Sequence, residues 1–368
     1  MNILILYPHL GPGVANFLID LAICLKGRGH RPLLATRGGA GLEKLTQQGI
    51  EHRLTELAFP GFIGELGPLA RLVREREVDI IDCRDYRAGS VGYILSRMTN
   101  RPYLLGIHAP RKGYNRFLVY YWSKPVMAVN RSVRDNLVRD FGVPEEQVRI
   151  TSTAIDTAHF TWCRPDAGIL GELRIDESTP VVMIVSRFER KKTGPAKTLI
   201  DSLKEVEKSI PGITAVLVGP GDDIDMLRER GAETNAALGR DAVKVLGFRK
   251  DIRELLSVAR LVVGTGKAAI EAMACGKPLI GAGRYGTVGL VTRDRAQVAE
   301  DTHFGDLGEA DPFTVNHLSG EMMRLFENPA LEEDLRNFGP VFAKKYDVNR
   351  VADTILQIYH DKLNGKWD

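Results

Sequence analysis

Short runs of apolar, β-favouring residues alternate along this chain with longer segments in which apolar residues recur every three or four positions. The runs of the first half are Asn2–Tyr7, Arg31–Thr36, Val78–Asp82, Pro102–His108, Pro125–Val129 and Val148–Ser152, with helical segments at Val14–Lys26, Leu66–Glu75 and Ser132–Phe141. The runs are apolar on both faces, which is typical of parallel strands covered by helices on each side. The pattern therefore predicts an α/β fold with a doubly wound sheet.

A second series of the same kind begins after a polar stretch around Trp162–Thr179. Its strand-like runs are Val181–Val185, Thr214–Val218, Val243–Leu246, Leu261–Val263 and Pro278–Gly281. We therefore expect two Rossmann-like domains, at residues 1–165 and 175–345, followed by an amphipathic helix within 346–368. Ligands of such sheets bind beyond the carboxyl ends of the strands, so polar residues there are the first candidates for a site. We expect the active site in the cleft between the two domains.

Composition narrows the class of protein. A formal charge of +3, from 50 basic and 47 acidic residues, does not favour a nucleic-acid partner. The four cysteines are far apart and form no CxxC pair, which argues against a zinc site or a disulfide framework and fits a reducing compartment. No apolar run approaches the roughly 20 residues of a membrane span, and the N-terminus does not resemble a signal peptide. We expect a cytoplasmic protein, at most peripheral on the inner face of a membrane.

A basic segment follows the first strand of the second series. Arg187 comes directly after the strand, Lys192 stands five residues on, and a helix is expected to begin near Pro195. A planar guanidinium and a lysine near a helix N-terminus suit a diphosphate. The alternative is a solvated basic loop.

Glycine-rich turns follow other strands. Gly11 and Gly13 precede the first helix, but Asn16 stands where a dinucleotide fingerprint has its third glycine, so a simple turn remains an equal alternative. Gly219 and the segment Gly247-Phe248-Arg249 follow strands of the second series. His108 ends a strand of the first series and is expected to face the cleft, unless it only caps the next element.

A third glycine segment, Gly264-Thr265-Gly266, opens a helix whose N-terminus can take a phosphate. Glu271 lies one turn into that helix, where its carboxylate can accept hydrogen bonds from a ribose. The segment Leu261–Ala268 is not a Walker A loop. Leu261 stands where that motif requires a glycine, and Ala268 stands where it requires a Ser or Thr. The alternative for Glu271 is an ion pair with Lys267 on the same helix.

In this order and spacing, these segments resemble family 4 of the retaining glycosyltransferases, over essentially the whole chain. The strongest match is Ile270–Pro278, which is similar to the family's Glu-Ala-x-Ala-x-Gly-x-Pro helix. The resemblance implies the GT-B fold, two Rossmann-like domains that face each other across a cleft, with the last helix crossing back to the first domain. It implies a nucleotide-sugar donor as substrate and no metal, since cationic side chains take the metal's place.

The resemblance also implies roles for single residues. Arg187 and Lys192 would hold the diphosphate and stabilise the leaving nucleotide, and Glu271 would bind the ribose. Phe248 and Arg249 would contact the base, and His108 would lie near the transferred sugar. The expected catalytic residues are therefore His108, Arg187 and Lys192.

The sequence departs from the family pattern in the donor half. The family's first motif carboxylate falls at Val263, or with a gap within Gly264–Gly266, so the contact to donor-sugar hydroxyls is in question. After Pro278 the usual Gly-Gly-x-x-Glu is missing, and Arg284 is expected to supply a third cation beside the diphosphate.

The segment 109–140 is basic and rich in aromatic residues, which suits an enzyme that acts on a lipid-linked acceptor at a membrane. A partly buried helix with a solvated basic face is the alternative. The leading hypothesis is retaining transfer of a sugar to a saccharide or lipid-linked acceptor in the synthesis of a surface polysaccharide or glycolipid. Two alternatives stay open, a nucleotide-sugar epimerase and a weakened or non-catalytic nucleotide-sugar-binding subunit.

Overall fold

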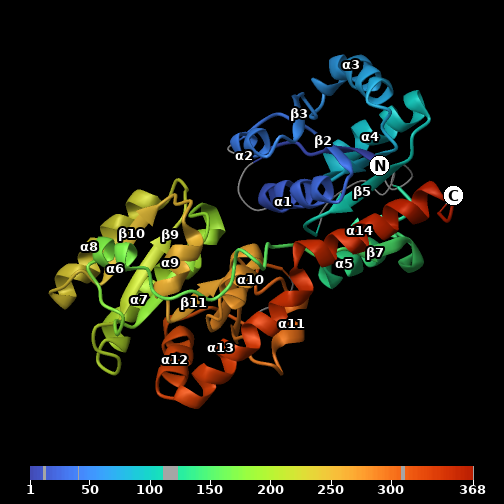
Figure 1. Cartoon of the computed structure of the whole chain (residues 1–368). Coiled ribbons are helices and arrows are strands. Elements are labelled where there is room, and N and C mark those ends of the chain that lie inside the picture. The colour runs from blue at the N-terminus through green and yellow to red at the C-terminus, as the bar shows by residue number, and fades with distance from the viewer. Residues whose placement is uncertain (11–13, 40, 111–122, 308–310, 368) are drawn as a thin grey trace. The chain divides into compact units, whose positions relative to one another are not determined.

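The computed structural model describes residues 1–10, 14–39, 41–110, 123–307 and 311–367. The chain forms two compact units, Met1–Ile155 together with Tyr346–Asp368, and Asp156–Lys345. Each unit is built on one sheet with helices packed against it (Figure 1). Both units are thus α/β domains with parallel sheets, as the alternating pattern predicted.

The first unit has a seven-stranded parallel sheet in the order β3-β2-β1-β4-β5-β6-β7. Its strands are β1 Asn2–Leu6, β2 Arg31–Thr36, β3 Glu51–Leu54, β4 Ile80–Cys83, β5 Tyr103–Ile107, β6 Val126–Ala128 and β7 Val148–Ile150. The hydropathy pattern did not predict β3, because this edge strand is polar and none of its residues is buried. The central strands are buried from Ile3 to Leu6 in β1 and from Ile80 to Cys83 in β4, since helices cover both faces.

The helices of the first unit include the last helix of the chain, α14. They are α1 Val14–Gly27, α2 Leu42–Gln47, α3 Phe62–Glu75, α4 Tyr86–Thr99, α5 Arg131–Phe141 and α14 Val348–Leu363, with a 3₁₀ turn at Glu145–Gln147. The apolar side of α14 joins the core around β1 and α1 through Val351, Ile355 and Tyr359. The predicted return of the last helix to the first domain is confirmed.

The second unit has a six-stranded sheet in the order β10-β9-β8-β11-β12-β13. Its strands are β8 Val181–Val185, β9 Thr214–Val218, β10 Val243–Gly247, β11 Leu261–Gly264, β12 Leu279–Gly283 and β13 Gly286–Leu290. The strands that the sequence predicted are parallel, and β13, which it did not predict, runs antiparallel to β12 at the edge of the sheet. The hydropathy pattern did not predict β13, because two of its five residues are glycines and glycine weakens a strand.

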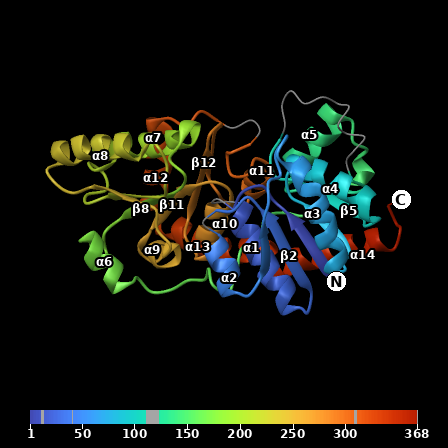
Figure 2. The same ribbon diagram turned by 90° about the horizontal axis from the view of Figure 1, so that it is seen from above.

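Helices cover both faces of the second sheet. They are α6 Ala167–Leu173, α7 Gly194–Val206, α8 Ile224–Leu238, α9 Ile252–Val258, α10 Gly266–Ala274, α11 Ala296–Asp301, α12 Val315–Phe326 and α13 Pro329–Ala343, with 3₁₀ turns η3 Arg190–Thr193 and η4 Lys344–Tyr346. α7, α8 and α12 lie on one side, and α9, α10 and α13 on the other (Figure 2). This is the doubly wound arrangement that the sequence predicted.

The two chain segments that join the units are hydrogen-bonded to each other. Ile155 donates its backbone N–H to the carbonyl of Tyr346 and accepts from the N–H of Val348, both at 2.9 Å. The first unit ends at Ile155, ten residues before the boundary at residue 165 that the break between the two series of strand-like runs predicted. Among the described residues, no helix is both long and apolar enough to cross a bilayer.

Candidate active site

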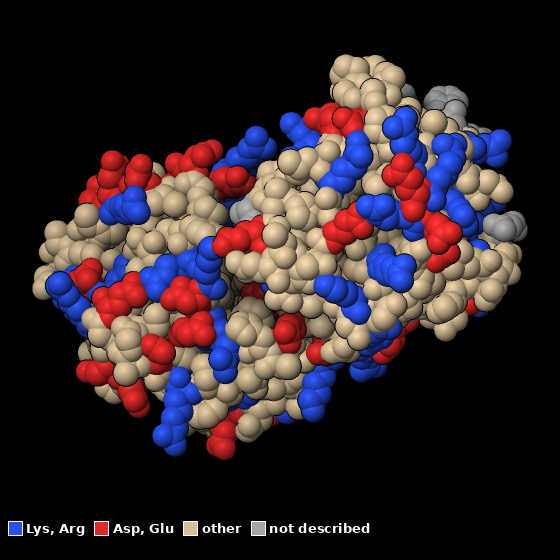
Figure 3. All heavy atoms as spheres, turned by 45° about the horizontal axis from the view of Figure 1, so that its top comes forward, with Lys and Arg blue, Asp and Glu red and all other residues tan. Residues whose placement is uncertain are grey.

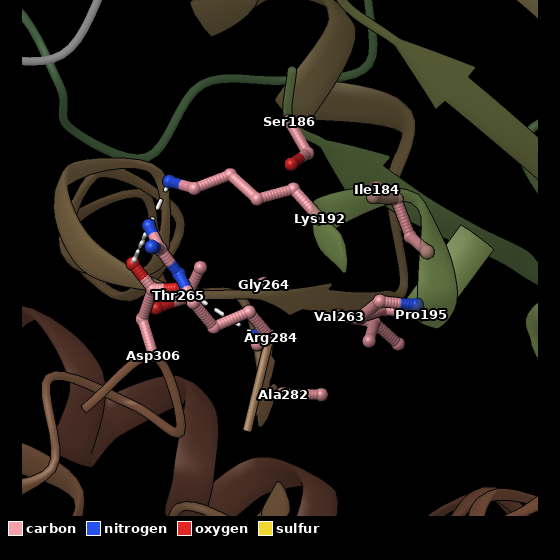
Figure 4. Close-up of a pocket in the computed structure, with 11 residues that line it drawn as sticks. Ile184, Ser186, Lys192, Pro195, Val263, Gly264, Thr265, Ala282, Arg284 and Asp306 are labelled. Atoms are coloured by element: carbon pink, nitrogen blue, oxygen red, sulfur yellow. Dashed lines mark hydrogen bonds and ion pairs between the residues drawn. The ribbon is translucent and has the colours of Figure 1, made fainter. Parts of the chain in front are cut away.

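A pocket lies at the carboxyl edge of the second sheet, in its centre. The neighbouring strands β8, β11 and β12 end there, and the sheet order shows that the chain winds one way after β8 and the other way after β11. Such a switch point opens a crevice between the loops, which is where open α/β sheets bind ligands. The pocket is lined by Ile184, Ser186, Lys192, Pro195, Val263, Gly264, Thr265, Ala282, Gly283, Arg284 and Asp306 (Figure 4).

Two cations meet one carboxylate in this pocket. Arg284, which follows β12, places its Nε 3.0 Å from Oδ1 of Asp306 and its Nη2 3.4 Å from Oδ2. Lys192, on the 3₁₀ turn before α7, places its Nζ 3.5 Å from Oδ2 of the same residue. Figure 4 shows the three charged ends turned toward one another. Two positive charges and one negative charge leave the cluster with one net positive charge.

Burial and charge act on each other here. Burial lowers the pKa of Lys192, and the nearby Arg284 and Arg187 lower it further, whereas Asp306 opposes the shift. Burial raises the pKa of Asp306, but the charges of Lys192 and Arg284 outweigh this effect and hold it below its ordinary value. The carboxylate is thus ionised at neutral pH, and it favours the charged form of the lysine.

The sequence analysis missed Asp306. It stands beyond α11, in a segment with no strand or helical period, next to a glycine. The backbone around it is unusual, since His303, Phe304 and Gly305 all have positive φ, at 53°, 60° and 89°. Two adjacent residues other than glycine in this region cost free energy, and such strain collects at functional sites. This conformation could not be predicted from local pattern.

Thr265 holds the strained segment in place. Its hydroxyl donates to the backbone carbonyl of His303 at 2.6 Å. A Cβ at Gly283 would lie 2.7 Å from the carbonyl oxygen of Gly305, so the end of β12 can approach the segment only as glycine. The predicted glycine segment therefore shapes the pocket, with Gly264 and Thr265 in its wall.

Arg187 does not line the pocket. Its Nη1 lies 3.1 Å from Oε1 of Glu189, and its side chain is 42% exposed. Its positive charge lowers the pKa of Lys192, the other residue that the sequence predicted to hold the diphosphate. Lys192 and Arg284, rather than Lys192 and Arg187, are the pair that converges.

At two further positions, Gly219 and Gly266, the structure explains why the residue is a glycine. Gly219, after β9, has φ 139°, and a Cβ there would lie 1.7 Å from the carbonyl oxygen of Ser186, so a side chain cannot fit. Gly266 begins α10 with φ 59°, and a Cβ there would meet the ring of His303 at 2.8 Å. Neither lines the pocket, but both allow the loops that do to approach each other.

Glu271 forms an ion pair with Lys267, which the sequence analysis gave as the alternative to a role in ribose binding. Its Oε1 lies 3.6 Å from Nζ of Lys267, and both side chains are close to nine-tenths buried. α10 presents this carboxylate one turn after Gly266, on the helix that starts at the pocket edge.

Phe248 and Arg249 differ in what they can offer a ligand. Phe248 follows β10 and is 56% exposed, so its ring is accessible. Arg249 is held by the carboxylates of Asp251 and Glu172, which raise its pKa. These contacts favour a structural role for Arg249. Asp251, which directly precedes α9, binds Arg249 and makes no side-chain hydrogen bond to the start of that helix.

The remaining expected residues belong to the first unit. His108 follows β5, and its ring packs against Phe17 with centroids 5.8 Å apart. The guanidinium carbon of Arg84 lies 5.8 Å from the centroid of the same Phe17 ring. Gly11 and Gly13 lie outside the described residues.

In the sequence analysis, the family's first motif carboxylate fell at Val263 or, with a gap, within Gly264–Gly266. Val263 is the third residue of β11, it is fully buried, and it borders the pocket. In the part of the chain that the structure describes, no group of three or more His, Cys, Asp or Glu side chains is arranged to hold a metal ion. The charged groups at the pocket are Lys192, Arg284 and Asp306.

Comparison with known proteins agrees with this architecture. Residues 12–159 match the family described as Glycosyltransferase Family 4, and residues 169–340 match Glycosyl transferases group 1. A phosphatidyl-myo-inositol mannosyltransferase of Propionibacterium freudenreichii is 22% identical, with 94% of this chain and 91% of that protein covered.

Solved structures share the fold. A glycosyltransferase from Rickettsia africae superposes with a TM-score of 0.81 at 19% identity, over 98% of both chains. Anabaena HepE in complex with UDP superposes with a TM-score of 0.76 at 22% identity, over 98% of this chain and all of that one. Because the two family matches divide the chain as its two α/β units do, the protein belongs to the family 4 glycosyltransferases of the GT-B fold, enzymes that transfer a sugar from a nucleotide donor.

Proposed function

We propose that this glycosyltransferase moves a sugar from a nucleoside-diphosphate donor to a saccharide or lipid-linked acceptor, with retention at the anomeric carbon, in the synthesis of a surface polysaccharide or glycolipid. The observation that carries the proposal is the convergence of Lys192 and Arg284 in a pocket at the switch point of the second sheet. Two fixed cations in a partly buried pocket suit a diphosphate far better than a neutral ligand. The lipid-linked acceptor follows the name of the mannosyltransferase relative, and the retaining outcome follows the resemblance to family 4 in the sequence motifs.

The chemistry assigned to these residues is stabilisation of the leaving group. The bond between the anomeric carbon and the diphosphate oxygen breaks through an oxocarbenium-like state, and negative charge grows on the departing phosphate. Lys192 and Arg284 meet that charge, and Arg187 adds to the positive potential from the pocket's edge. Glu271 would accept hydrogen bonds from the ribose, Phe248 would stack on the base, and His108 would act near the transferred sugar.

A melting-temperature screen tests donor binding. We expect UDP, GDP, ADP or CMP, or one of their sugars, to stabilise the protein by about 3 kcal/mol at a hundredfold excess over its Kd, since it binds only the folded state. Lys192→Ala should remove this shift. Lys191→Ala is the matched control, because it removes the same charge from the adjacent, exposed position. If no nucleotide shifts the wild-type protein, the proposal fails.

Turnover separates the alternatives. A transferase consumes the donor only with an acceptor, an epimerase needs none, and a binding subunit shows no turnover. Lys192→Ala should lower transfer about 10²- to 10³-fold, the usual loss when one group that stabilises developing negative charge is removed. The anomeric configuration of the product, read by NMR, tests retention. The binding-subunit alternative rests on Val263, which is buried, borders the pocket and carries no carboxylate, and turnover would exclude that alternative.

We also propose a peripheral membrane contact through residues 109–140, of which 111–122 lie outside the described residues. In the described remainder, Arg134 pairs with Asp135 and Glu145, and Arg139 pairs with Asp140, so the proposal rests on the basic and aromatic composition of the segment rather than on these two arginines. Figure 3 shows basic and acidic side chains intermixed over one face of the protein as a whole. Co-sedimentation with anionic vesicles tests the contact, and indifference to them would exclude it.

A further inference from the structure

The donor pocket contains an anion of the protein's own, and this is unexpected for a site that binds anions. Asp306 contacts both cations of the pocket, Arg284 through two nitrogens and Lys192 through one. Its side chain is only 9% exposed, while those of Lys192 and Arg284 are 22% and 37% exposed. The carboxylate is therefore the most buried member of the cluster.

Several local features fix the position of this carboxylate. The strained residues His303 and Phe304 precede it, Thr265 anchors that segment, and Gly283 lets β12 come close to it. The backbone N–H of Arg284 also lies 3.4 Å from Oδ1 of Asp306. A residue held by a strained backbone next to a ligand site is a candidate for function.

We propose that Asp306 is a resident counter-anion of the donor site, whose carboxylate competes with the donor's diphosphate for Lys192 and Arg284 and so limits nucleotide affinity. This inference rests on the proposed function, since it assumes that the pocket takes the diphosphate. The competition follows from the contacts. The nitrogens that face Asp306 are the donors that a phosphate oxygen in this pocket requires.

A site with both cations unopposed would hold the nucleotide product tightly. Product release sets the turnover of many enzymes, so a built-in competitor that speeds release has a clear use. The carboxylate also offsets the repulsion between the two cations and keeps Lys192 charged, so that both remain ready for the diphosphate. Asp306 thus acts on the reaction through Lys192 and Arg284, as a positioning residue.

The test is the affinity of Asp306→Asn for ligands of different charge. The ligands are inorganic pyrophosphate and the nucleoside diphosphate selected by the melting screen, with its monophosphate and its free nucleoside. We expect calorimetry at pH 7 to show diphosphate bound on the order of tenfold more tightly than by wild type, with a smaller gain for the monophosphate and none for the nucleoside. The gain should shrink in high salt, because charges at a partly exposed site are screened.

Asp334→Asn is the matched control, since it removes the same charge from an exposed ion pair with Arg293 that does not line the pocket. It should leave all four affinities unchanged. Asp306→Ser is a second variant, in case the asparagine disturbs packing, and should also tighten diphosphate. With a measurable donor, KM and kcat should both fall in Asp306→Asn, because slow product release limits turnover.

Weaker or unchanged diphosphate binding in both Asp306 variants, with the melting curve of a folded protein, overturns the inference. An equal gain for the nucleoside also overturns it, because that gain would not depend on charge. If the wild-type protein binds neither pyrophosphate nor any nucleotide, the proposed function fails instead, so the two failures are distinguishable.

Discussion

Each unit places an arginine and an aspartate together near the carboxyl edge of its sheet, but the two clusters differ in access. In the first unit, Asp82 on β4 and the following Arg84 form an ion pair at 2.7 Å, with both side chains fully buried. The hydroxyl of Tyr359 on α14 donates to the same carboxylate. In the second unit, Arg284 and Asp306 line a pocket together with Lys192, and the side chain of Arg284 is 37% exposed.

The difference shows what decides whether an ion pair is structural or functional. A closed pair has no other ligand to meet, so its contacts serve the fold, here by joining α14 to the sheet. A pair at a pocket can exchange one partner for a ligand of the same charge. The residue types are the same in both clusters, so burial and the surrounding loops make the distinction.

The largest effect is expected from breaking the closed cluster. Asp82→Ala leaves the Arg84 charge buried without its carboxylate. Removing one partner of a buried ion pair costs stability, and we expect the free energy of unfolding to fall by about 3–5 kcal/mol. We expect a lower melting temperature for the first unit and faster hydrogen exchange in the amides of α14.

Tyr359→Phe is the control for that variant. It removes one hydrogen bond and keeps the ion pair, so it should cost only about 1 kcal/mol. If Asp82→Ala destabilises no more than Tyr359→Phe, the closed cluster does not hold α14 in the way described.

A smaller effect is expected from a buried cation whose hydrogen bond goes to a backbone carbonyl rather than to a carboxylate. Lys277 donates from Nζ to the carbonyl of Ser257 at 2.9 Å, and burial lowers its pKa to about 8. The unfolded chain binds this proton up to about pH 10.4, so the free energy of unfolding should rise with pH between about 8 and 10. The rise relative to Lys277→Met should be about 3 kcal/mol, at about 1.4 kcal/mol per pKa unit.

Urea denaturation across that pH range measures the difference between the two proteins. Lys208→Met, at an exposed position, is the control and should follow the wild-type curve. Parallel curves for wild type and Lys277→Met would show that the lysine is not buried as described.

The smallest effect on stability is expected for Asp306→Asn, the counterpart of Asp82→Ala in the open cluster. Its cationic partners are partly exposed, and water can replace the lost contacts, so we expect a cost of about 1 kcal/mol or less. Thermal denaturation measures it. A loss as large as that of Asp82→Ala would mean that both clusters are structural, and the contrast between them would disappear.

Much of the fold could be predicted from the sequence. Strands such as Arg31–Thr36 and Val181–Val185 appear with the bounds that their apolar runs predicted. The two edge strands β3 and β13 were missed, since one is polar and the other rich in glycine. Edge strands are formed by a partner that hydropathy does not reveal.

The site was predictable only in part. Lys192, Gly264, Thr265 and Arg284 were found because each follows a strand, and the ends of neighbouring parallel strands meet. Arg249 also follows a strand and was expected to contact the donor, but its guanidinium binds the carboxylates of Asp251 and Glu172. Nothing local marks Asp306, which reaches the pocket on a loop whose backbone is set by Thr265 and Gly283.

The sequence alone determined the order of elements, the two-domain organisation, the glycine turns and the likeness to a family, because these depend on local periodicity and on residues close together in the chain. Tertiary structure decided which charges meet. Tyr359 donates a hydrogen bond to Asp82, which lies 277 residues earlier in the chain. Asp306 forms ion pairs with Lys192 and Arg284 from a separate loop. Charge pairing depends on distance and burial, and both are set only when the chain has packed.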